Sequence, residues 1–109
     1  MTYAELKTAL AATKIPFAED EWKNAEALGT DYGVYALDGR NDLQADGGHA
    51  EKLAEGTVDL FIRTGTESVQ VALVESALDT AGVKWHYNSR QYEHETGLTH
   101  IEWVFYCLP

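Results

Sequence analysis

Apolar residues recur at helical spacing near the start of the chain. They predict an amphipathic helix that ends at about Thr13. Thr2 and Glu5 have the spacing of a capping box, in which each side chain satisfies a free backbone amide of the first turn. Pro16 ends this helix, so residues 15–18 are expected to form a short strand at a sheet edge. The apolar stripe of the helix consists of Tyr3, Leu6 and Leu10.

Alternating apolar and polar residues predict two strands in the middle of the chain. The first runs from Asp31 to Asp38, and the second rises from His49 to Thr64. The segment between Asp38 and Gly48 is rich in glycine and aspartate, which indicates a turn or a long loop.

A second helix is expected to run from Thr66 to Ala81, with Gly82 as a left-handed C-terminal cap. Its broad apolar face is typical of a helix that packs on a sheet. This face consists of Val69, Leu73, Val74, Ala77 and Leu78.

The C-terminal segment predicts a β-hairpin whose large apolar side chains have odd numbers and must share one face. These residues are Trp85, Tyr87, Ile101, Trp103, Phe105 and Cys107. A three-residue loop at residues 95–97 satisfies this requirement and puts Gly97 at a left-handed position. The expected register pairs Trp85 with Cys107, Tyr87 with Phe105, Arg90 with Glu102 and Tyr92 with His100.

The order of these elements predicts an α+β fold. Two helices pack on one face of a mainly antiparallel sheet that ends in a C-terminal β-hairpin. The length of 109 residues fits a single domain over residues 1–109.

The composition excludes several classes of protein, and the acidic residues are concentrated in one region of the chain. One cysteine, Cys107, excludes an internal disulfide framework, and no secretory signal or membrane-spanning run of apolar residues is expected. The net charge of −10 disfavours a protein that grips nucleic-acid phosphates. Eleven acidic and three basic residues fall between Pro16 and Asp59, a net charge of −8.

The sequence predicts no catalytic, metal or cofactor site. Nucleophile motifs and phosphate-binding glycine patterns do not occur, and the acidic runs are best interpreted as solvated surface. In the expected hairpin, His94 and His100 are diagonal neighbours, which provides two potential ligands where a metal site needs at least three. Trp22, Tyr32 and Tyr35 lie in or beside the acidic half of the chain, and core packing is the more common role for such aromatic residues. The alternative is a protein interface, with Trp22 as its main candidate.

The chain resembles the tail terminator, or tail completion, proteins of long-tailed bacteriophages and prophages. The resemblance covers about residues 15–108, and the chain departs from the family pattern at Trp22 and Gly33. It rests on the segments Ile15–Phe17, Asp31–Leu37, Gly56–Thr64, Ala81–Trp85 and Thr99–Tyr106.

The resemblance implies a structural virion protein made in the bacterial cytoplasm and placed in the tail or neck. Such proteins form rings, usually hexamers, that cap the tail tube, stop its polymerisation and join it to head–tail connector proteins. An acidic lumen would let DNA pass without specific binding, and no membrane partner is implied. A long loop from Asp38 to Glu55 is the expected contact element, with Asp42, Leu43, Asp46, His49 and Glu51 as its candidate interface residues.

Three other interpretations remain open. Another head–tail neck protein would have the same features. A small acidic DNA mimic fits the charge, although the second helix is mostly apolar and uncharged. A small enzyme that uses the hairpin histidines would contain stoichiometric metal.

Overall fold

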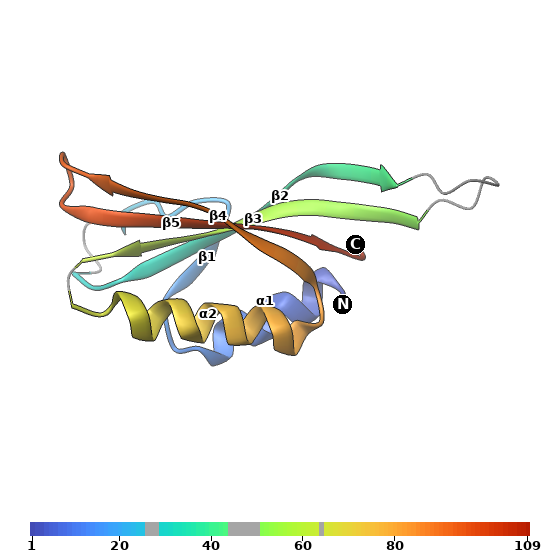
Figure 1. Cartoon of the computed structure of the whole chain (residues 1–109), viewed down its shortest axis with the longest axis horizontal. Helices are drawn as coiled ribbons and strands as arrows, with labels where there is room; N and C mark the ends of the chain where they lie inside the picture. Colours follow the sequence, from blue (N-terminus) through green and yellow to red (C-terminus); the bar gives the residue numbers. More distant parts are fainter. Residues whose placement is uncertain (26–28, 44–50, 64) are drawn as a thin grey trace.

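The computed structural model describes residues 1–25, 29–43, 51–63 and 65–109 (Figure 1). Two helices lie on the same face of a five-stranded sheet, in which β1 runs parallel to β2 and the other neighbours are antiparallel. The strand order β1-β2-β3-β5-β4 confirms the predicted fold class and the C-terminal hairpin. The elements are α1 (Tyr3–Ala12), β1 (Phe17–Glu19), β2 (Tyr32–Leu43), β3 (Glu51–Ile62), α2 (Glu67–Ala81), β4 (Lys84–Glu93) and β5 (Leu98–Cys107).

The core lies between the two helices and the sheet. The odd-numbered residues of β5 are buried on the sheet side of the core, as the sequence predicts. Cys107 is one of them, and desolvation raises its pKa. The buried face of α2 differs from the predicted one: Val74, Ala77 and Leu78 are buried. Val69 and Leu73 are 61% and 38% exposed. The fully buried side chains include Leu6, Leu10, Val58, Leu60, Val74, Leu78, Ile101, Trp103 and Phe105.

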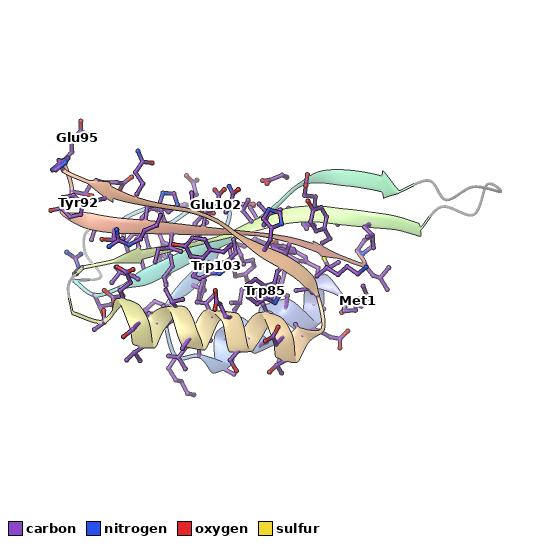
Figure 2. The ribbon with its side chains drawn as sticks, in the orientation of Figure 1. Met1, Trp85, Tyr92, Glu95, Glu102 and Trp103 are labelled. Carbon is purple, nitrogen blue, oxygen red and sulfur yellow. The ribbon has the colours of Figure 1, made fainter. Side chains whose placement is uncertain are left out.

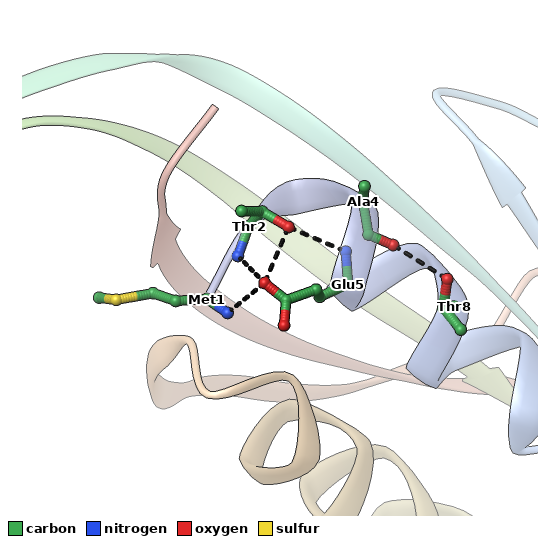
Figure 3. A network of polar contacts seen from close by, with 5 residues as sticks. All are labelled: Met1, Thr2, Ala4, Glu5 and Thr8. Carbon is green, nitrogen blue, oxygen red and sulfur yellow. Dashed lines mark hydrogen bonds and ion pairs between the residues drawn. The ribbon is translucent and has the colours of Figure 1, made fainter.

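Both predicted helix caps are present. The Thr2 hydroxyl accepts a hydrogen bond from the Glu5 amide at 3.2 Å, and the Glu5 carboxylate accepts one from the Thr2 amide at 3.0 Å (Figure 3). The terminal ammonium of Met1 also donates to Glu5 at 2.8 Å, and this contact contributes most to lowering the pKa of Glu5 to about 2. At the end of α2, Gly82 has φ 73°, the left-handed conformation expected of a C-terminal cap. None of the helices in the described ranges is long and apolar enough to cross a membrane.

The central hairpin is longer than the sequence predicts. Both ends of the segment expected to be a loop, from Asp38 to Glu55, are β-strand, because β2 continues to Leu43 and β3 begins at Glu51. Their register runs on to the pair Leu43↔Glu51, with an irregularity between Leu37 and Gly39. The prediction of a loop is therefore wrong for residues 38–43 and 51–55, whereas the strand predicted from His49 is confirmed from Glu51 onward. Residues 44–50 lie outside the described residues.

The C-terminal hairpin has a different register from the one expected. Glu93 pairs with Leu98, so the connection has four residues, and Arg90 lies opposite Ile101 and Tyr92 opposite Thr99. A bulge at Asn88, between Tyr87 and Ser89, then shifts the pairing by one residue. Trp85 consequently pairs with Phe105 and Tyr87 with Trp103, two residues away from their predicted partners.

Candidate functional site

Three of the five interface residues predicted in the loop lie on a two-stranded arm formed by the ends of β2 and β3. Asp42 and Leu43 are at the end of β2, and Glu51 is at the start of β3. Asp46 and His49 lie outside the described residues. β5 pairs with β3 only as far as Ala54↔Cys107, so the strands beyond this point extend past the rest of the sheet (Figure 1).

The second exposed surface is the sheet face opposite the helices. Figure 2 shows Glu102 on this side of the sheet, whereas Trp103 of the same strand points toward α2. A row of stacked rings crosses this face from β2 to β5. The rings of Tyr32 and Phe61 lie 4.9 Å apart, and those of Phe61 and His100 lie 4.4 Å apart.

Two carboxylates and an imidazole meet beside these rings. Asp59 of β3 lies opposite Glu102 of β5, and His100 reaches Asp59 from the same face. The distance from His100 Nε2 to Asp59 Oδ1 is 2.7 Å, and this contact is the largest cause of the raised pKa of His100. Desolvation and the nearby Asp59 raise the pKa of Glu102, although Asn88 donates a hydrogen bond to it at 2.7 Å.

Further negative charge lies close to this cluster. Burial, Asp59 and Glu55 together raise the pKa of Asp38, which lies within β2. The carboxylates of β2, β3 and β5 thus crowd on the open face of the sheet. Part of the acidity that the sequence places between Pro16 and Asp59 is concentrated here.

Trp22 covers one end of the same face. Its indole Nε1 donates a hydrogen bond to the Gly33 carbonyl oxygen at 2.9 Å, which fixes the ring over β2. Beneath it is a shallow hollow of about 360 Å³, lined in part by Val34, Asp59 and His100. Tyr32 also faces this hollow, whereas Tyr35 packs against the core and lies edge-on to Tyr3 at 6.0 Å. Of the three aromatic residues predicted near the interface, Tyr35 is therefore a core residue.

Sequence reasoning missed the Asp59 cluster because it compared histidines only with one another and with cysteine. His94 lies in the hairpin turn against Tyr92, with 4.9 Å between the rings, while His100 lies opposite Gln91. The expected pairing of His94 with His100 is thus replaced by one between His100 and Asp59. The available signal was Asp59 itself, a charged residue within the predicted second strand.

The third surface is the outer edge of β4. This strand is ten residues long, ends the sheet and is mostly exposed along its length. Tyr87 is 46% exposed and Tyr92 is 49% exposed. Lys84, Arg90 and Glu93 give the strand a net positive charge, in contrast to the chain as a whole.

Comparisons of the chain with protein-family models and with curated proteins found no match.

Proposed function

We propose that this protein is a structural component of a bacteriophage tail or neck. It assembles as a ring, caps the tail tube, ends tube polymerisation and joins the tail to head–tail connector proteins. The resemblance of five segments of the sequence to tail terminator proteins supports this proposal. The structural observation that carries it is the arm formed by β2 and β3.

The arm has features of a subunit contact. A two-stranded hairpin has marginal stability in water unless it packs against another surface. Beyond Ala54↔Cys107, the described strands pair only with each other, and beyond Glu19↔Tyr35 the outer edge of β2 has no partner strand in the described ranges. A neighbouring subunit or the tail tube would supply the missing contacts.

The β4 edge provides a second and different surface for assembly. An exposed strand edge presents unpaired backbone groups that can pair with another chain. Contacts between two different surfaces are head-to-tail, and such contacts generate a ring when the rotation between subunits closes.

The charge of the protein fits the passage of DNA through such a ring. With a net charge of −10, a lumen lined by this chain would repel the phosphate backbone. DNA would then slide through without specific binding, while the tube and connector proteins bind the faces of the ring.

The arm is tested by reversing one charge in it. Asp42→Lys, among the last residues of β2, should weaken assembly, measured by light scattering and by binding to purified tail tubes. Glu95→Lys is the matched control, because Glu95 lies in the hairpin turn at the other end of the molecule (Figure 2). Equal assembly of the two variants would remove the arm from the proposal.

A further inference from the structure

The cluster on the open sheet face has the composition of a metal site. Asp59, His100 and Glu102 each bring one potential ligand atom within 4.8 Å of the other two. No second group of three such side chains meets anywhere in the described part of the chain. Two carboxylate oxygens and one imidazole nitrogen provide the three protein ligands found in metal sites that keep one position open.

The backbone holds these ligands in place. All three project from adjacent strands, and Asp59 and Glu102 form a direct cross-strand pair. The ring of Phe61 stacks on His100 at 4.4 Å and fixes its orientation. Asn88 donates to Glu102 at 2.7 Å, as an outer hydrogen bond does for a metal-binding carboxylate. Little rearrangement of the sheet would be needed to bring the three atoms around one ion.

The surroundings favour a cation with an open coordination position. Asp38 adds negative charge near Asp59. Asp59 and His100 also line the hollow beneath Trp22, so a fourth ligand can enter from this side. An imidazole ligand favours Zn²⁺ and similar transition metals over Mg²⁺ or Ca²⁺, which prefer oxygen alone.

We propose that Asp59, His100 and Glu102 bind one divalent transition-metal ion, with Zn²⁺ as the representative ion. The hydrogen bond between His100 and Asp59 opens as both atoms become ligands, and a water molecule occupies the position facing the hollow. This site is independent of the proposed assembly role, and it differs from the pair of histidines considered from the sequence.

The test is calorimetric titration of the metal-free, full-length protein with Zn²⁺. We expect one bound ion per chain. Asp59→Asn and His100→Gln, both close in size to the native residues, should each weaken binding at least about tenfold. Circular dichroism and thermal melting will establish that both variants are folded, and Glu102→Gln provides a third variant if either of them is not.

The other histidines supply the controls. His94→Ala and His86→Ala change exposed residues of the same hairpin and should leave Zn²⁺ affinity unchanged. Co²⁺ added to the native protein should give visible absorption bands that are lost in His100→Gln. Failure of the native protein to bind Zn²⁺, or binding that survives His100→Gln but is lost in His94→Ala, would overturn the proposal. In that case the three side chains form only a hydrogen-bonded charge cluster.

Discussion

Among single residues, Asp31 links the start of β2 to the segment that leads into α2. Its buried carboxylate accepts hydrogen bonds from the Arg63 amide at 2.8 Å and the Gln70 side chain at 3.0 Å. The Thr66 hydroxyl donates a third. Burial alone would raise the pKa of Asp31, but these hydrogen bonds outweigh it and the pKa is lowered. The ionised form therefore stabilises the folded protein.

We predict that Asp31→Asn lowers the free energy of unfolding by about 2 kcal/mol at neutral pH, since hydrogen bonds to a charged group are lost. Because the pKa is lower in the folded protein than in the unfolded chain, this stabilisation is present above the unfolded pKa. It is lost as the pH falls through the folded pKa. Urea denaturation from pH 7 to about pH 3 should show the gap between native and variant closing with acidification. Asp20→Asn, at an exposed carboxyl, is the control, and a gap independent of pH would contradict the account.

Gly33 shows why a strand can require glycine. A Cβ atom at this position would lie 2.1 Å from Cε1 of the Phe17 ring, which packs across β2 from the edge strand. Gly33→Ala should therefore lower the free energy of unfolding by about 1–3 kcal/mol. Gly39→Ala is the matched control, because nothing lies within 4 Å of its Cβ position. Urea denaturation measures both, and equal stability of the two variants would show that Phe17 moves aside without cost.

At the scale of elements, the sequence predicts those parts that bury one face. The capping box of α1, the glycine cap at the end of α2 and the buried face of β5 are local patterns, and all three are confirmed. The extension of β2 to Leu43 was missed because alternation of apolar residues marks a strand only where one face is buried. The glycines and aspartates of this segment therefore looked like a loop.

The hairpin register failed for a related reason. The predicted register requires an uninterrupted ladder from the turn to Trp85, but the bulge at Asn88 changes the pairing midway. The four-residue turn and the bulge compensate for each other, so Trp85 and Tyr87 still lie opposite buried residues of β5. Between the turn and the bulge, the changed pairing places Arg90 on the helix side, where it binds Glu67 through two hydrogen bonds of 2.8 Å.

The Asp59 cluster depends on the pairing of β3 with β5, which neither strand's own sequence predicts. Asp59 and His100 are separated by 41 residues and meet only because β5 lies beside β3 in the sheet. The order of strands results from packing of the whole domain. Each residue alone is an ordinary polar position on a strand.

The edge of β4 leads to a prediction about assembly. Tyr92→Lys adds a charged side chain near the end of an exposed edge strand, and charged edges disfavour pairing with another protein chain (Figure 2). The variant should stay folded and form fewer oligomers by light scattering. Ala72→Lys adds the same positive charge at an exposed position of α2, and this variant should assemble normally. Normal assembly of both would exclude the β4 edge from the subunit contact.

For the whole molecule, charge opposes self-association. A chain with a net charge of −10 repels its own copies, and added salt screens this repulsion. We therefore predict that the oligomeric fraction, measured by analytical ultracentrifugation, rises as the salt concentration increases from about 0.05 to 0.5 M. A fall in this fraction would mean that ion pairs between subunits dominate the contact.

Shape and charge together define the central claim, which is that this elongated chain forms a ring at the end of a tail tube. Its principal extents are 50 × 26 × 25 Å, and the arm extends along the longest axis (Figure 1). Negative-stain microscopy of the purified protein with tail tubes, supported by mass from light scattering, tests this claim most directly. The account predicts closed rings, or caps at the tube ends. A protein that stays monomeric and leaves the tubes uncapped would contradict it.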